Sequence, residues 1–339
     1  MGMLREGQWT EDEAVIAAGA YVRQASVFKQ AIGTDVIEAI AAEPGRFHLI
    51  ASQSCPWSHR TMLFRTLKNL GDVIPLHITY GPRVEGYAAN GGADWTAPGT
   101  DKTIRHLHQL YSLSEADYTG RVTVPVLWDS KRRQIVSNES AAIIRGFDAV
   151  RPANGQLDFT LVPEQLMPAI DAINEEIYEG LSNGVYRTVF AERQEAYDLA
   201  VQQVFRTLEK LNARLASQRY LLGSTITEAD WRLFPTLMRF DTVYYVQHRC
   251  NYRRLVDYPD LWAYARDLYA WQGVVETLNL DDMRKANYAN EPHGIVAIAP
   301  DADWHAPHGR EALGSARIAL RSSKDVKVDP ARYRKRTGS

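Results

Sequence analysis

The N-terminal half of the chain alternates between two spacings of apolar residues. Residues 47–51 alternate between apolar and more polar positions, which predicts a strand ending near Ala51. Residues 59–70 place their apolar side chains on one helical stripe. The predicted elements are, in order, a strand at 47–51, a helix at 59–70, a strand at 76–80, a helix at 104–113, paired strands at 124–128 and 134–136, and a helix at 141–147. This order is that of a thioredoxin-like α/β domain.

The C-terminal half keeps helical spacing instead. Long amphipathic stretches predict helices around 204–215, 231–238 and 261–269, and no strand is predicted between about 165 and 280. Thr227 and Asp230 form a capping-box pattern ahead of the second of these helices. We therefore expect an all-α C-terminal domain behind the α/β domain.

The remaining segments are mixed or polar. Residues 11–20 indicate a short helix, 82–100 a loop, and the basic tail a surface or disordered segment. The predicted organisation is an N-terminal arm at 1–45, a thioredoxin-like domain at 46–150, a helical domain at 160–290 and a C-terminal extension at 291–339.

Composition and charge narrow the class of protein. The 339 residues are 45% hydrophobic and 24% charged, as in a globular protein, and the net charge of −2 gives no general attraction to nucleic acid or to membranes. Neither an apolar run that could span a membrane nor a signal peptide is evident. Two cysteines, Cys55 and Cys250, are too few for a disulfide scaffold or a zinc site. We expect a cytoplasmic protein without a metal.

Cys55 carries the strongest chemical signal. It begins the sequence Cys-Pro-Trp-Ser between the first strand and the first helix. Backbone amides at a helix N-terminus stabilise a thiolate, and a thiolate is a strong nucleophile. Ser58 stands where a second cysteine would resolve a disulfide internally, so an external thiol such as glutathione has to complete a redox cycle. A lone cysteine is more often a buried structural residue, but this context reverses that preference.

Two further motifs follow in the same predicted domain. Pro125 lies within Val-Pro-Val and is a candidate cis proline, which would expose the backbone of Val124 to a peptide-like ligand; an edge-strand proline is the alternative. Glu139 and Ser140 precede a helix, where an acidic side chain and backbone amides suit the ammonium and carboxylate of a γ-glutamyl group. Simple helix capping is the alternative for this pair.

Taken together, the motifs resemble the glutathionyl-hydroquinone reductases, the Xi class of glutathione transferases. The resemblance covers about residues 40–310. It is carried by the segments 54–61, 120–129, 138–140, 227–234, 239–244 and 257–262. It implies a thioredoxin-like domain followed by an all-α domain, glutathione as cosubstrate, and a homodimer.

The resemblance also implies a mechanism and its residues. The thiolate of Cys55 attacks the glutathionyl sulfur of the substrate, the hydroquinone leaves, and free glutathione resolves the mixed disulfide. A tyrosine on the helical domain donates the proton, and this role falls on Tyr186, with Tyr244 assisting the cysteine. Glutathione contacts carry over to Arg121, Val122, Thr123, Val124, Glu139 and Ser140.

The chain departs from the family pattern at two places near the expected site. The family usually has a tryptophan beside glutathione where this chain has Tyr87, so either Tyr87 or nearby Trp95 is expected to pack on the ligand. A further active-site tyrosine is expected where Asn287 stands, and Tyr288 lies one residue away. These changes bear on the identity of the substrate more than on the thiol step.

Two other classes of function remain open from the sequence. A glutaredoxin-like thiol transferase, a dehydroascorbate reductase or a lyase acting on other aromatic adducts would use the same thiolate. A ligandin-like protein would bind conjugates without turnover. Measuring Cys55 alkylation against pH, together with product release from a glutathionyl quinone adduct, separates these functions.

Overall fold

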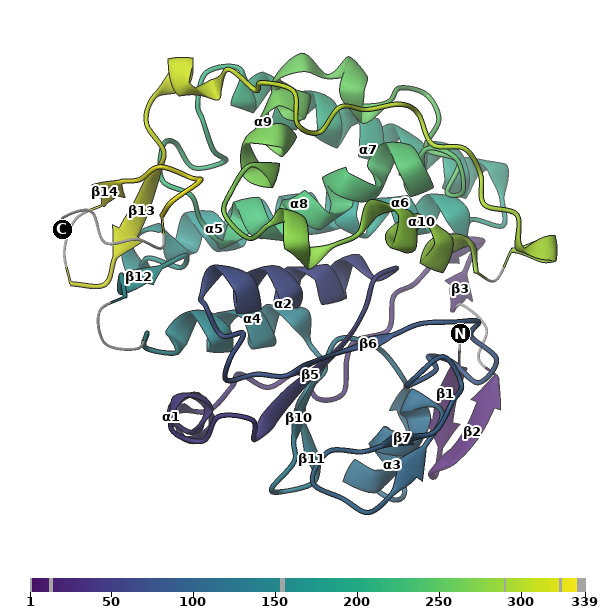
Figure 1. The fold of residues 1–339 in the computed structure, drawn as a ribbon. Helices are drawn as coiled ribbons and strands as arrows, with labels where there is room; N and C mark the ends of the chain where they lie inside the picture. Colours follow the sequence, from purple (N-terminus) through teal and green to yellow (C-terminus); the bar gives the residue numbers. More distant parts are fainter. Residues whose placement is uncertain (1, 12–14, 153–155, 290, 323–324, 334–339) are drawn as a thin grey trace. The chain divides into compact units, whose positions relative to one another are not determined.

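The computed structural model describes residues 2–11, 15–152, 156–289, 291–322 and 325–333 (Figure 1). These residues form two compact units. The first takes its residues from 1–14, 23–151 and 277–296, and the second from 15–22, 152–276 and 297–339. No helix in the described ranges is long and apolar enough to cross a membrane.

A four-stranded sheet forms the centre of the first unit. Its strands are β5 (Phe47–Ser52), β6 (Leu76–Thr79), β10 (Val126–Asp129) and β11 (Gln134–Ser137). They lie in the order β11-β10-β5-β6, with β5 and β6 parallel and the other pairs antiparallel. The strands lie close to where the sequence predicted them, although burial alternates clearly only in β11 among these four, and β10 is buried at all four positions.

Helices cover both faces of this sheet (Figure 1). They are α1 (Thr34–Ala42), α2 (Pro56–Leu67), α3 (Leu107–Ser114) and α4 (Ser140–Ala149). Helix α10 (Leu280–Tyr288) also belongs to this unit. Helices α2 and α4 pack against each other. Helix α3 shares a core with Ile50, Val126 and Trp128, which are alternate positions of β5 and β10 and so lie on one face. The predicted thioredoxin-like fold is confirmed.

The N-terminal segment is more ordered than an arm of loops. Strand β1 (Gly2–Arg5) pairs with β2 (Gln8–Glu11) and with β9 (Gly120–Arg121), which enters the predicted glutathione segment. The predicted loop at 82–100 contributes β7 (Trp95–Thr96) to a pair with β8 (Thr103–Ile104).

The short helix predicted at 11–20 is wrong for the described part of that segment, since 12–14 lie outside it. Instead, β3 (Ile16–Ala17) pairs with β4 (Ala20–Tyr21). Ala18 and Gly19 connect them with φ of 52° and 79°, and this left-handed backbone ends any helical path.

The second unit is mainly helical. Its α-helices are α5 (Met167–Ile177), α6 (Gly184–Val189), α7 (Gln194–Leu215), α8 (Glu228–Arg239) and α9 (Pro259–Tyr269), with π-helical turns η2 (Tyr178–Ser182) and η3 (Phe240–Tyr244). Every residue from 165 to 280 is described, and no strand occurs there. The C-terminal tail adds β13 (Arg317–Leu320) and β14 (Val326–Lys327) to β12 (Phe159–Thr160), so that part of it is ordered in a small sheet.

Asp230 fixes the start of α8, as the capping pattern predicted. Its carboxylate accepts hydrogen bonds from the backbone N–H and hydroxyl of Thr227 at 2.8 and 3.1 Å. It also accepts from Leu221 N at 2.9 Å and Tyr264 OH at 2.9 Å. Burial raises the pKa of Asp230, and these donors oppose that rise. The four bonds join the start of α8 to α9 and to the preceding turn.

Candidate active site

Cys55 is the N-cap residue of α2. Its backbone is extended (φ −89°, ψ 118°), and Pro56 occupies the first helical position, where a missing N–H costs nothing. The Ser58 amide donates to Cys55 Sγ at 3.4 Å. Cys55 is 7% exposed and forms no disulfide. The predicted strand, cysteine, helix arrangement is present, so one amide and the helix dipole both favour negative charge on this sulfur.

The loop before β10 lies against the same sulfur. The Val124–Pro125 peptide bond is cis, as the sequence predicted, and Cys55 Sγ lies 3.5 Å from the carbonyl oxygen of Val124. Tyr111 holds this loop through its hydroxyl, which donates to Thr123 O at 2.8 Å. Val122 and Val124 belong to the same buried cluster as Cys55, with Trp57 and Tyr87 packed against it.

Glu139 is the N-cap residue of α4. Its carboxylate accepts from Ala141 N at 3.2 Å and from the hydroxyl of Ser26 at 3.0 Å. Asn138 donates to Thr123 Oγ1 at 3.3 Å, which joins this helix start to the cis-proline loop. Ser140 is buried beside Glu139. Glu139 therefore caps its own helix, and its second oxygen is held by Ser26 rather than by the neighbouring backbone.

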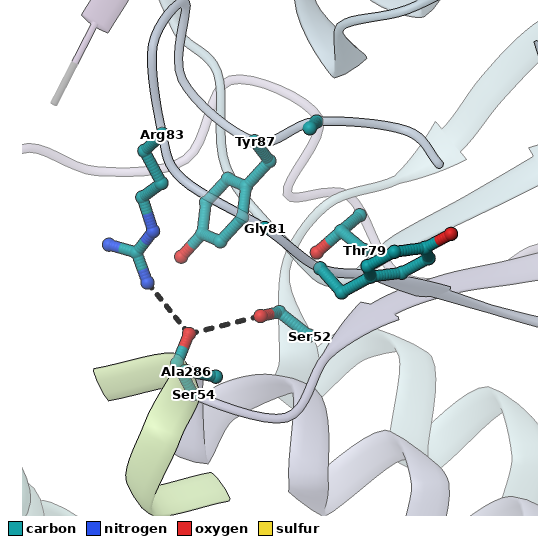
Figure 2. Close-up of a pocket in the computed structure, with 9 residues that line it drawn as sticks. Ser52, Ser54, Thr79, Gly81, Arg83, Tyr87 and Ala286 are labelled. Atoms are coloured by element: carbon teal, nitrogen blue, oxygen red, sulfur yellow. Dashed lines mark hydrogen bonds between the residues drawn. The ribbon is translucent and has the colours of Figure 1, made fainter. Parts of the chain in front are cut away.

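A small pocket lies beside the cysteine loop (Figure 2). Its lining is Ser52, Ser54, Thr79, Tyr80, Gly81, Arg83, Tyr87, Ala88 and Ala286. Arg83 donates to Ser54 Oγ at 2.7 Å, and Ser54 Oγ lies 3.0 Å from Ser52 Oγ. Figure 2 shows these hydroxyls and that of Thr79 turned toward one space. The pocket thus combines one cation with several hydrogen-bonding groups next to Cys55.

Tyr87 forms one wall of this pocket. The Arg83 guanidinium lies 4.5 Å from the centre of its ring, a cation–π contact. Burial raises the pKa of Tyr87, and Arg83 opposes the rise. Two residues after the cysteine, Trp57 has guanidinium groups on its ring from Arg60 at 4.3 Å and Arg23 at 4.6 Å. The surroundings of Cys55 are therefore positive and aromatic.

The remaining predicted residues of the first unit lie on β9 and α10. Arg121 pairs with Met3 in the β1–β9 sheet, with its side chain partly exposed. Tyr288 ends α10, and burial raises its pKa. Ala286, two residues earlier, lines the pocket, whereas Asn287 bonds back to Met283 O at 2.8 Å.

Tyr186 and Tyr244 lie together in the second unit. Tyr244 ends the π-helical turn η3, and Tyr186 follows η2 on α6. Their ring centres are 6.2 Å apart, and His248 contacts both rings, at 5.3 Å from Tyr186 and 4.8 Å from Tyr244. π-Helical turns often occur at functional sites. The family resemblance assigned separate roles to the two tyrosines, proton donation to Tyr186 and assistance of the cysteine to Tyr244, but did not identify His248.

The sequence also missed Ser52, Ser54, Thr79 and Arg83. Their only sequence signal is position, because Ser52 and Thr79 end the parallel strands β5 and β6 and Arg83 follows four residues later. The carboxyl ends of parallel strands are where ligands bind in α/β sheets.

Comparison with family models places the chain among glutathione transferases. Residues 54–150 match the model described as "Glutathione S-transferase, N-terminal domain", and residues 194–267 match "Glutathione S-transferase, C-terminal domain". Each match falls within one of the two compact units.

Relatives that match over nearly the whole chain identify the family more specifically than the domain models do. The chain is 40% identical over 328 residues to glutathionyl-hydroquinone reductase YqjG of Escherichia coli, covering 92% of this chain and 99% of the relative. It is 38% identical to glutathionyl-hydroquinone reductase PcpF of Sphingobium chlorophenolicum, covering 88% and 96%.

Solved structures agree with these relatives. A Xi-class transferase from Natrialba magadii superposes with a TM-score of 0.78 at 38% identity, covering 93% of this chain and 98% of that one. The glutathione-bound structure of YqjG from Escherichia coli K-12 gives a TM-score of 0.74 at 42% identity, covering 79% and 89%.

Proposed function

Since the chain belongs to the glutathionyl-hydroquinone reductases of the Xi class of glutathione transferases, we propose that it reduces glutathionyl-hydroquinones to hydroquinones through a mixed disulfide on Cys55. Glutathione is the cosubstrate. The overall reaction converts one glutathionyl-hydroquinone and one glutathione into one hydroquinone and one glutathione disulfide.

The first step forms the mixed disulfide. The Cys55 thiolate attacks the glutathionyl sulfur, and the bond from that sulfur to the ring carbon breaks. The electron pair of this bond goes to the ring carbon, which takes a proton and becomes C–H. We assign this proton to the phenol of Tyr186, because a positioned acid is required at the leaving carbon. The ring is reduced by two electrons, and the two sulfurs are oxidised to a disulfide.

The second step regenerates the cysteine. The thiolate of free glutathione attacks the glutathionyl sulfur of the mixed disulfide, which releases glutathione disulfide and the Cys55 thiolate. No protein thiol is available for this step in the motif, because Ser58 occupies the resolving position. The second cysteine is unsuited to the role, since burial raises the pKa of the Cys250 thiol to about 12.

The observation that carries the proposal is the position of Cys55 Sγ. It accepts from the Ser58 amide at a helix N-terminus and borders the cis-proline loop, whose backbone suits a peptide-like ligand. The test is to supply the glutathionyl adduct of menadione as its hydroquinone, with glutathione, and to measure menadiol and glutathione disulfide. We expect equal amounts of the two products. Turnover of mixed disulfides alone would indicate a thiol transferase, and binding without turnover a ligandin-like protein.

Glutathione is held by the two loops around Cys55 in this proposal. The backbone of Arg121, Val122, Thr123 and Val124 and the start of α4 at Glu139 and Ser140 receive the cysteinyl and γ-glutamyl parts. The pocket containing Tyr87 and Arg83 receives the glycine carboxylate, since a guanidinium and several hydroxyls are suitable partners for that group.

Arg83→Met is expected to raise the KM for glutathione about tenfold with little change in kcat, the loss typical of one charged hydrogen bond. We expect the unaltered enzyme to bind the glycine ethyl ester of glutathione more weakly than glutathione, and Arg83→Met to lose this difference. Steady-state kinetics with both thiols measures this.

Arg132→Met is the matched control. It removes the same charge from an exposed side chain of the same unit, which pairs with Asp35. Its kinetics should match those of the unaltered enzyme. If Arg83→Met still bound the ethyl ester more weakly than glutathione by the same factor, this pocket would be excluded as the carboxylate site.

We further propose a cytoplasmic homodimer. The reaction needs a compartment rich in reduced glutathione, which fits the cytoplasm. Size-exclusion chromatography with light scattering tests the assembly, and a mass of 38.3 kDa in solution would contradict it.

A further inference from the structure

Hydrogen bonds join the segment that follows Tyr244 to α6, the helix that carries Tyr186. His248 Nδ1 lies 2.9 Å from the carbonyl oxygen of Val185, the residue before Tyr186 on α6. Arg249 donates to the carbonyl oxygens of Thr188 and Val189 at the end of the same helix. Cys250 N donates to Tyr244 O at 3.0 Å, which joins the segment back to the turn η3. These contacts connect the two tyrosines through one short stretch of chain.

The bond to Val185 determines which nitrogen of His248 carries a proton. A carbonyl oxygen only accepts, so Nδ1 must be the N–H donor. His248 is 7% exposed, and burial lowers its pKa to about 4. The ring is therefore neutral at physiological pH, with the proton on Nδ1 and a lone pair on Nε2.

The same ring lies against both phenol rings. Its contacts with Tyr244 at 4.8 Å and Tyr186 at 5.3 Å are shorter than the 6.2 Å between the two tyrosines. His248 thus completes a cluster of three rings, and a backbone carbonyl sets its orientation. A charged imidazolium in this position would have to be desolvated, whereas the neutral ring packs without that cost.

We propose that His248 is a positioning residue that holds the phenols of Tyr186 and Tyr244 in the arrangement needed for proton donation to the leaving ring carbon. The inference rests on the proposed function, because it takes Tyr186 as the acid. It predicts a defect confined to the step in which a carbon is protonated, since misplacing a catalytic group by about 1 Å costs up to about 100-fold in rate.

Two substrates isolate that step. In the glutathionyl adduct of menadiol, the leaving atom is a ring carbon, which needs a proton. In the mixed disulfide of glutathione with 2-mercaptoethanol, the leaving group is a thiolate, which needs none. Both substrates leave the same glutathionyl disulfide on Cys55. His248→Asn keeps an N–H donor for Val185 but removes the ring. We expect its kcat for the aromatic adduct to fall at least about tenfold, with kcat for the disulfide within about twofold and KM for glutathione unchanged.

Arg249→Met is the matched control, since it removes bonds from the same segment to α6 without touching the tyrosine rings. It should change the two activities by the same factor. His248→Phe keeps an aromatic ring without the bond to Val185 and should give a smaller selective loss, which keeps the test open if His248→Asn fails to fold.

Equal loss on both substrates, or no loss on the aromatic adduct, in the folded His248 variants would overturn the inference. Tyr186→Phe, measured alongside, separates the role of His248 from the assignment of Tyr186 as the acid. If Tyr186→Phe loses only the aromatic activity and the His248 variants do not, the role of His248 is wrong while the proposed function stands. If Tyr186→Phe shows no selective loss, the assignment of the acid is wrong.

Discussion

Cys55→Ser is expected to lower kcat/KM for glutathionyl-hydroquinone reduction by at least about 10³-fold, the scale of loss when a catalytic nucleophile is removed. A serine hydroxyl is not ionised near neutral pH and forms no disulfide with glutathione, so both steps of the proposed cycle are lost. The variant should fold, because serine is close to cysteine in size. Product formation by chromatography, with glutathione binding measured by calorimetry, tests both statements.

Cys250→Ala is the matched control for the loss of a thiol. Cys250 is fully buried in the second unit, where its sulfur lies 3.3 Å from Thr188 Oγ1. Its removal should leave kcat/KM within about twofold, since the thiol has no part in the cycle, although it should cost some stability. Reduction by Cys55→Ser at a few per cent of the normal rate would rule out the mixed-disulfide route.

Tyr186→Phe is expected to lower kcat for the glutathionyl adduct of menadiol about 100-fold, the usual contribution of a general acid. The ring and its contacts with Tyr244 and His248 remain, and only the proton donor is lost. Because a thiolate leaving group needs no such proton, turnover of the mixed disulfide with 2-mercaptoethanol should be unchanged. Steady-state kinetics on both substrates measures the difference.

Tyr252→Phe serves as its control, because this side chain is 78% exposed in the same unit and loses the same hydroxyl. It should affect neither substrate. If Tyr186→Phe reduced both activities alike, the phenol would have a structural role. If it reduced neither, the acid would have to be sought at Tyr244 or Tyr288.

Most of the sheet and the long helices follow from local pattern. Strands β5 and β6 begin with alternating polarity, β10 is a short apolar run, and α7 buries one stripe from Ala200 to Leu215, so short-range spacing predicts them. The start of α8 was predictable because Thr227 and Asp230 cap it by themselves. The cis peptide at Pro125 followed from its place in the thioredoxin-like order.

The missed strands are short, and two of them pair with distant partners. Strand β9 pairs with β1, more than 110 residues earlier, and β13 pairs with β12 across most of the second unit. Two-residue strands have too little pattern to reveal such partners. Helix α1 was missed because its nine residues bury only Val36 and Ile40.

The residues of the candidate site also fall into those that a local motif predicts and those whose contacts are distant in sequence. Cys55 and Val124 were predictable because each lies in a motif with a local cause. The roles of Arg83 and His248 depend on residues far away in sequence, since Arg83 meets Ser54 and His248 meets Val185 only through folding. For Glu139 the sequence predicted a ligand contact with a helix cap as the alternative, and the carboxylate caps α4 through Ala141 N. The same carboxylate would have to serve both purposes.

Intact-protein mass spectrometry of a single turnover detects the mixed disulfide on Cys55 itself. The enzyme is mixed with one equivalent of the glutathionyl adduct of menadiol, without free glutathione, and quenched in acid. We expect one added glutathionyl group per chain, mapped to the Cys55 peptide, and one menadiol released for each. Release of menadiol from protein that carries no glutathionyl group, or carries it at Cys250, would contradict it.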